Sequence, residues 1–161
     1  MTDWEGFRIY AINPNGTLKW LYFRPSHNLF SSCAIGNDGT IYVTATGGED
    51  LSILEAVNPD GSLKWEAYVQ DTCYIAPILS SDNKIYVGSN DKKLYAFDLD
   101  GNLLWTLNLQ EKVTSQPLLS PDGAIYFSCS NILYAIIGCA GPANCPWPMV
   151  GQNIKRNCRQ P

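Results

Sequence analysis

Short apolar segments separated by turn residues recur along the whole chain. Within these segments the spacing is that of strands, and no stretch of ten or more residues carries apolar positions at the helical period. β-branched and aromatic residues fill runs such as 84–87 and 93–97, and Asn-Gly or Asp-Gly pairs follow several of the runs. Such pairs are the strongest short signal for a hairpin, because the turn needs a residue with positive φ. The pattern predicts an all-β fold of short antiparallel strands.

One six-residue phrase occurs three times, as NGTLKW, DGSLKW and DGNLLW, and each copy ends in tryptophan. The three tryptophans lie 45 and 40 residues apart; an alanine precedes each by nine residues, and a tyrosine follows each by 21 or 22. Because the alanine, the tryptophan and the tyrosine recur at matching spacings in three copies, the sequence contains an internal repeat. The repeat positions are Trp20, Trp65, Trp105, Ala11, Ala56, Ala96, Tyr42, Tyr86 and Tyr126.

Each repeat is expected to form four strands, with the tyrosine on the second, the alanine on the third and the tryptophan on the fourth. Four antiparallel strands every forty or so residues are typical of a β-propeller blade, in which we expect the tryptophan to fill the wedge between blades and the alanine to let backbones approach. The predicted organisation of residues 1–138 is a third-and-fourth strand pair at 7–22 and blades at 30–69, 75–109 and 115–138, or about three and a half blades. Residues 139–161 form a tail with cysteine and proline, which can supply a last strand.

Residues 86–105, YVGSNDKKLYAFDLDGNLLW, resemble the repeat of pyrroloquinoline-quinone-like (quinoprotein-like) β-propellers, and the resemblance covers residues 7–138. The tail segment PWPMVGQN at 146–153 is similar to a Trp-Pro-Met segment at an end of such propellers. The resemblance implies a propeller and favours an extracytoplasmic protein. Residues 1–7, however, contain two acidic residues and lack the basic residues and the apolar run with which a secretory signal peptide begins.

The resemblance does not extend to the quinone site. Quinone-dependent dehydrogenases of this family use an adjacent Cys-Cys disulfide, a calcium ion beside the quinone and a catalytic aspartate, whereas this sequence has no adjacent cysteines and matches none of those positions. The alanine-to-tryptophan spacing of nine, with Asn-Gly or Asp-Gly between, is that of the family's non-enzymatic members. We therefore expect no cofactor, no metal, no catalytic residue and no enzyme activity.

The predicted strands number 13 or 14, which is too few for most rings, since propellers close with roughly four to eight blades. An open array would expose edge strands and apolar blade faces. Three explanations remain open: a homodimer or other homo-oligomer that completes a ring of seven or eight blades, a fragment of a longer propeller, and closure of four blades within one chain. Self-association is favoured, because it covers the exposed faces.

Composition narrows the classes of partner. The 161-residue chain has a net charge of −4 and an isoelectric point near 4.8, which disfavour nucleic acid and anionic membranes as partners. Its longest apolar run, 132–137, is too short to span a bilayer. The single histidine, His27, is expected in a loop, and the acidic turn that begins at Asp98 is expected to be a hairpin turn rather than a calcium site.

The six cysteines divide into two groups. Cys33, Cys73 and Cys129 are predicted to be small core or strand residues. Three others cluster in the tail, where a disulfide between Cys139 and Cys145 would close the shorter loop.

A group of aromatic residues near strand ends and connections is expected to be exposed, either as an interface between chains or as a peptide or glycan surface. The main hypothesis is a non-enzymatic propeller module that acts as a protein-interaction scaffold. The alternatives are a fragment of a quinone-dependent oxidoreductase propeller and a carbohydrate-binding module. The aromatic residues are Trp4, Tyr22, Phe23, Phe30, Tyr68 and Tyr74.

Overall fold

The computed structural model describes residues 6–29, 31–47, 51–121 and 123–137. The described residues form β-strands joined by turns and contain no helix, so none of them form a helix long and apolar enough to cross a membrane. The strands are β1 (Phe7–Ile12), β2 (Leu18–Arg24), β3 (His27–Leu29), β4 (Ala34–Ile35), β5 (Ile41–Gly47), β6 (Leu51–Val57), β7 (Leu63–Gln70), β8 (Ile78–Leu79), β9 (Lys84–Gly88), β10 (Lys93–Asp98), β11 (Leu103–Asn108), β12 (Leu118–Leu119), β13 (Ile125–Cys129) and β14 (Ile132–Ile136).

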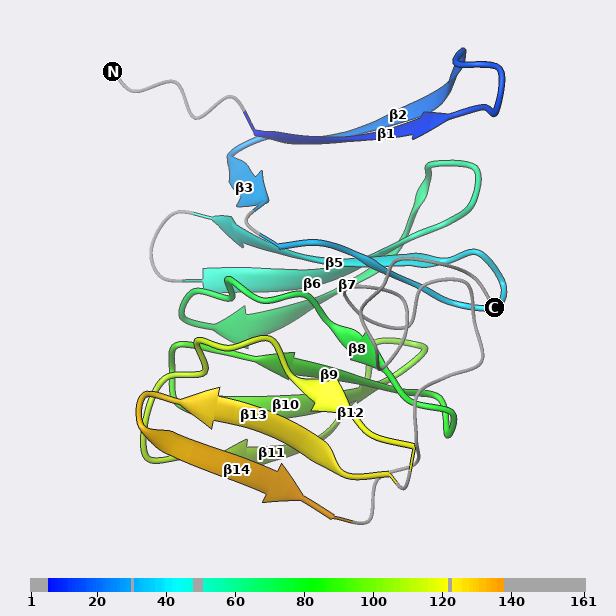
Figure 1. Cartoon of the computed structure of the whole chain (residues 1–161). Helices are drawn as coiled ribbons and strands as arrows, with labels where there is room; N and C mark the ends of the chain where they lie inside the picture. The colour runs from blue at the N-terminus through cyan, green and yellow to red at the C-terminus, as the bar shows by residue number, and fades with distance from the viewer. Residues whose placement is uncertain (1–5, 30, 48–50, 122, 138–161) are drawn as a thin grey trace.

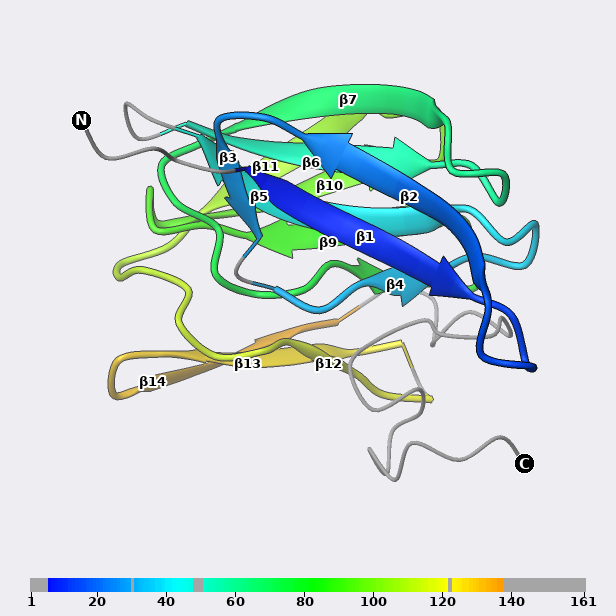
Figure 2. The same cartoon turned by 90° about the horizontal axis from the view of Figure 1, so that it is seen from above.

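The strands form four antiparallel sheets that follow one another in the sequence. They are the hairpin β1–β2, a sheet ordered β3-β5-β6-β7 in which β4 also pairs with β5, a sheet ordered β8-β9-β10-β11, and a sheet ordered β12-β13-β14. Figure 1 shows the sheets stacked face to face in chain order, with β1–β2 at one end and β12–β14 at the other. Seen from above, the hairpin lies over the two middle sheets, and the sheet β12–β14 lies to one side of them (Figure 2). The prediction of an all-β fold with four-stranded antiparallel blades is confirmed.

The Asn-Gly and Asp-Gly turns have one geometry. In the turn between β6 and β7, Gly61 N–H donates to the carbonyl of Asn58 at 2.9 Å, and Asn58 N–H donates to the carbonyl of Ser62 at 2.8 Å. Gly61 has φ +88°, a conformation that glycine adopts without steric cost. The same pair of hydrogen bonds closes the turns at 13–17 and 98–102, and each hairpin contains a bulge beside its turn.

The connection after β2 differs from the sequence prediction. His27 was expected in a loop, but it begins β3, a short strand that pairs with β5 opposite Gly47. Ser26 has φ +61°, so the chain reverses at Pro25 and Ser26 and brings residues 27–29 back alongside the second sheet. The second sheet consequently has five strands instead of four.

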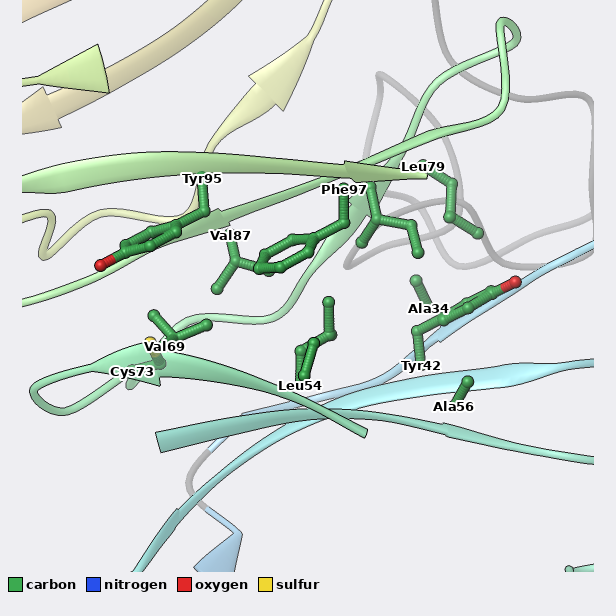
Figure 3. Close-up of a cluster of buried hydrophobic side chains, with 12 residues drawn as sticks. Ala34, Tyr42, Leu54, Ala56, Val69, Cys73, Leu79, Val87, Tyr95 and Phe97 are labelled. Carbon is green, nitrogen blue, oxygen red and sulfur yellow. The ribbon is translucent and has the colours of Figure 1, made fainter. Parts of the chain in front are cut away.

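The core consists of three apolar clusters, one between each pair of successive sheets. Figure 3 shows the middle cluster, in which Tyr42 and Leu54 of the second sheet face Leu79 and Phe97 of the third. β6 has a sheet on both sides and is buried on both faces. β1 has a neighbour on one side only, and its exposed positions alternate with buried or half-buried ones. The different burial of β6 and β1 therefore follows from the number of sheets that pack against them.

Candidate interaction surfaces

The repeated tryptophans join successive blades. The indole Nε1 of Trp65, in β7, donates a 2.8 Å hydrogen bond to the carbonyl oxygen of Leu99 in the next blade's turn. The Trp65 ring lies only 2.8 Å from the position that a β-carbon on Gly101 would occupy. Glycine is thus required twice in this turn, for its positive φ and for the close approach of the indole.

Trp20, in β2, makes the same contact one blade earlier. Its Nε1 donates to the carbonyl oxygen of Pro59 at 2.8 Å, and its ring lies 2.8 Å from where a β-carbon on Gly61 would stand. The turn of each following blade is therefore a dock for the indole of the blade before it. We call these turns, 58–61 and 98–101, the indole docks.

The alanine of each repeat stands between the tyrosine and the tryptophan. Tyr42 pairs with Ala56 and Ala56 pairs with Trp65, so the three side chains form a row on one face of the sheet. The rings of Tyr42 and Trp65 meet over the alanine with centroids 5.9 Å apart. A larger residue at position 56 would separate the two rings. In the third sheet the same row, with Ala96 in the middle, has centroids 5.8 Å apart.

The row is incomplete in the last sheet. Tyr126 pairs with Ala135, but no described residue supplies a tryptophan beyond β14. Tyr126 is accordingly 37% exposed, whereas Tyr42 and Tyr86 are 1% exposed. Tyr126 therefore differs from the sequence expectation of a packing position equivalent to the other two.

A buried ionic cluster holds the hairpin β1–β2 against the second sheet. Glu55, in β6, is fully buried; it accepts a hydrogen bond from Tyr22 Oη at 3.1 Å, and Arg24 Nε lies 3.2 Å from its Oε1. The Arg24 contact is within ion-pair distance but lacks hydrogen-bond alignment, so Oε1 accepts no hydrogen bond from the described residues. Arg24 also donates to Glu66 at 2.6 Å. Burial raises the pKa of Glu55 above its ordinary value, against the opposing effect of Arg24.

The outward face of the hairpin is apolar and uncovered by any described residue. Tyr10 pairs with Leu21 on this face, and the Arg8 guanidinium lies 4.9 Å from the centroid of the Phe23 ring. Tyr10 is 56% exposed and Ile12 is 58% exposed. We define the N-terminal face by its exposed apolar residues Tyr10, Ile12, Leu21 and Phe23.

A second apolar face lies at the other end of the stack, on the outer side of β13 and β14. Leu133 is 72% exposed and Ile137 is 85% exposed, beside the half-covered Tyr126. These three residues define the C-terminal face. Both ends of the described stack thus expose large apolar side chains.

One hollow opens between the second and third sheets. It has a volume of about 190 Å³ and is lined by two turns that include Asp38 and Asn83. Burial alone would raise the pKa of Asp38, but hydrogen bonds from Thr40 and the Lys64 ammonium at 3.1 Å hold it at about 2. The carboxylate in this hollow is thus already paired.

Some predicted residues fall elsewhere than expected. Tyr22 was expected to be exposed, but its ring is buried against Phe7 at a centroid distance of 6.0 Å and its hydroxyl binds Glu55, so that prediction was wrong. Phe23, Tyr68 and Tyr74 are exposed. Trp4 and Phe30 lie outside the described residues.

The cysteines that the structure describes have no disulfide partner. Cys73 and Cys129 are buried and Cys33 is partly buried. Cys139 and Cys145, the pair that would close the shorter loop in the tail, lie outside the described residues. Among the described residues, no group of three or more His, Cys, Asp or Glu side chains is placed to hold a metal ion. The turn at Asp98 uses its carboxylate to accept N–H bonds from Asp100 and Asn102, as a hairpin turn does.

The stacked antiparallel sheets, the docked tryptophans and the repeated turns define a β-propeller repeat protein. The family model PQQ_2, described as outer membrane protein assembly factor BamB, matches residues 5–137. The chain belongs to this family of quinoprotein-like propellers, and the resemblance seen in the sequence is confirmed.

Two solved structures share the fold. A protein of unknown function from Bacteroides caccae matches with a TM-score of 0.58 at 14% identity, over 79% of this chain and 48% of that chain. BamB from Moraxella catarrhalis matches with a TM-score of 0.61 at 14% identity, over 79% of this chain and 39% of that one. The uncharacterized protein YxaL of Bacillus subtilis (strain 168) is 38% identical over 66 residues, or 40% of this chain and 15% of YxaL. The chain thus spans less than half the length of each of these proteins.

Proposed function

We propose that this chain is a non-enzymatic β-propeller module that acts as a protein-interaction scaffold and completes its ring by self-association. The observation that carries the proposal is the pair of exposed apolar faces at the two ends of the blade stack. Inside the stack, equivalent faces are covered by a neighbouring blade and form the core clusters. The end faces are apolar like the inner faces, but no blade among the described residues covers them.

The two end faces are complementary in kind. Each face combines aliphatic side chains with aromatic rings, so either can pack against the other. If two copies join head to tail through a twofold axis, the N-terminal face of each meets the C-terminal face of the other, and both junctions are identical. Such a closed arrangement leaves no apolar blade face exposed to solvent.

The family description supports a protein partner over a small-molecule substrate. The family is described as an outer membrane protein assembly factor, which is a role in contact with other proteins. A completed ring would present its turns and loops at two rims, and we propose these rims as the scaffold's contact surfaces for further proteins.

Charge substitutions on the end faces test this proposal. Leu133→Glu and Tyr10→Glu each place a carboxylate at an exposed position, so the isolated chain should tolerate both. Light scattering after size exclusion should give the wild type a mass near twice 17.8 kDa and each variant a mass near 17.8 kDa. The matched control is Leu103→Glu, which adds the same charge at an exposed position of β11, the outer edge of a middle blade.

The control variant should assemble like the wild type. If all three variants keep the mass of the wild-type oligomer, the end faces are not the interface and the proposal fails. If the wild type is itself a monomer at every concentration, self-association fails as a whole.

A further inference from the structure

The hairpin β1–β2 carries a third copy of the indole dock. In the turn 13–16, Gly16 N–H donates to the carbonyl of Asn13 at 2.9 Å, and Asn13 N–H donates to the carbonyl of Thr17 at 2.8 Å. Gly16 has φ +84°, against +88° and +85° for the glycines of the two other docks. The backbone of this turn is therefore built to the same pattern.

This third dock is empty among the described residues. A β-carbon on Gly61 or Gly101 would lie 2.8 Å from an indole, whereas a β-carbon on Gly16 would have nothing within 4 Å. In the two filled docks, the indole N–H donates to the carbonyl of the second residue of the turn, which is Pro59 or Leu99. In the turn 13–16 that residue is Pro14, and no described side chain donates to its carbonyl.

We propose that the turn 13–16 is an acceptor site for a tryptophan indole, filled in trans by Trp147 of a second copy of this chain. This inference rests on the proposed self-association and specifies one contact within it. The N-terminal face lies on the same hairpin, so an indole in the dock would extend the interface at that face.

The choice of Trp147 follows from the other tryptophans. Trp20 and Trp65 fill docks within the chain. Trp105 stands in the third sheet, so the blade that follows it, β12–β14, belongs to the same chain. Trp4 precedes β1 in the sequence and does not stand at a repeat position.

Trp147 is the next tryptophan after Trp105; it follows Ala135 by 12 residues, where the repeat places a tryptophan after nine. Trp147 therefore stands at the C-terminal end of the chain. In a closed ring of two copies, the last blade of one copy would precede the hairpin of the other.

The test blocks the dock with the side chain that tolerates positive φ best. Gly16→Asn places a side chain where the indole would lie, and asparagine accepts positive φ, as Asn83 does here at φ +61°. The control is Asn15→Asp, which introduces the acid found at the equivalent positions Asp60 and Asp100 and leaves Gly16 open. Trp147→Ala removes the proposed occupant.

Sedimentation velocity over a dilution series measures the dimer dissociation constant of each variant. Because buried tryptophans are frequent hot spots, Gly16→Asn and Trp147→Ala should each raise the dissociation constant on the order of tenfold or more. The double variant should be no weaker than the weaker single variant, because both changes remove one contact. Asn15→Asp should match the wild type.

The outcomes separate this inference from the proposed function. A dimeric wild type whose dissociation constant is unchanged by Gly16→Asn overturns the dock and leaves self-association standing. A dimer weakened by Gly16→Asn but not by Trp147→Ala, or weakened additively by both, overturns the assignment of Trp147. A wild type that is monomeric throughout overturns the proposed function, and with it the contact in trans.

Discussion

The indole of Trp65 and the backbone of Gly101 are in direct contact across two blades, because the glycine carries no β-carbon where the ring lies. The same indole donates to the carbonyl of Leu99, two residues before that glycine. One side chain thus combines apolar burial and a hydrogen bond at the junction of successive sheets. The Asp-Gly pair in the turn is as much a part of the blade interface as the tryptophan itself.

Removing this indole should cost a large share of the chain's stability. Trp65→Ala is expected to lower the free energy of unfolding by roughly 3–5 kcal/mol, because it leaves a cavity between two blades. Trp65→Phe retains a ring but not the N–H donor, so it should lose at least about 1 kcal/mol. Urea denaturation monitored by circular dichroism measures both values. Leu104→Ala, at an exposed position, should change stability by less than about 0.5 kcal/mol.

The small residue between Tyr42 and Trp65 should not tolerate enlargement. Ala56→Val inserts two methyl groups under rings whose centroids are 5.9 Å apart, and we expect it to destabilise the fold by about 1–3 kcal/mol. Ala135 occupies the same place in the last sheet but is exposed. Ala135→Val therefore serves as the control and should be close to neutral when it is compared in the Leu133→Glu background, which we expect to be monomeric. Equal losses from both variants, measured by urea denaturation, would contradict the role given to the alanine row.

Glu55 should make stability depend on pH. Burial raises its folded pKa above the ordinary value of 4.5, so its stabilising contribution is present below that value and is lost as the pH rises through the raised pKa. The charged or titratable groups that act on it are Tyr22, Arg24, Glu66 and His27.

Replacing this carboxyl with an amide should remove the dependence. Relative to the wild type, Glu55→Gln should gain stability between about pH 4 and about pH 7, measured by urea denaturation at one protein concentration. A stability difference between the two proteins that stays constant over this range would show that the Glu55 pKa is not raised in the folded state.

Cys73 should be chemically inert in the folded protein. Burial raises the pKa of its thiol to about 12, and the thiolate is the form that reacts. Alkylation by iodoacetamide, followed by peptide mass spectrometry, should therefore modify Cys73 at least about tenfold more slowly than the partly exposed Cys33. In denaturant the two rates should converge. Rapid modification of native Cys73 would mean that the junction between the second and third sheets opens readily.

The repeat made much of the fold predictable. The spacing of Trp20, Trp65 and Trp105 indicated blades, and the Asn-Gly and Asp-Gly pairs indicated turns whose glycines indeed have positive φ. Both features are local or periodic, so they are visible without knowledge of the packing. The docking of each indole on the next turn follows from the stacking of the blades.

The ionic cluster could not be predicted in the same way. Glu55 stands inside an apolar run, but its partners Tyr22 and Arg24 lie more than thirty residues earlier and meet it only through face-to-face packing of two sheets. Tyr22 was assigned to the surface because it stands near a strand end, and its position in the sequence does not reveal which face of the strand is covered. β3 was missed because its formation depends on the unusual φ of Ser26.

The solution mass of the wild-type chain across a dilution series tests self-association most directly. Light scattering should give a mass near twice 17.8 kDa at high concentration, falling toward 17.8 kDa only on strong dilution. A well-folded protein that stays at 17.8 kDa at every concentration would show that the exposed apolar faces do not bind a second copy.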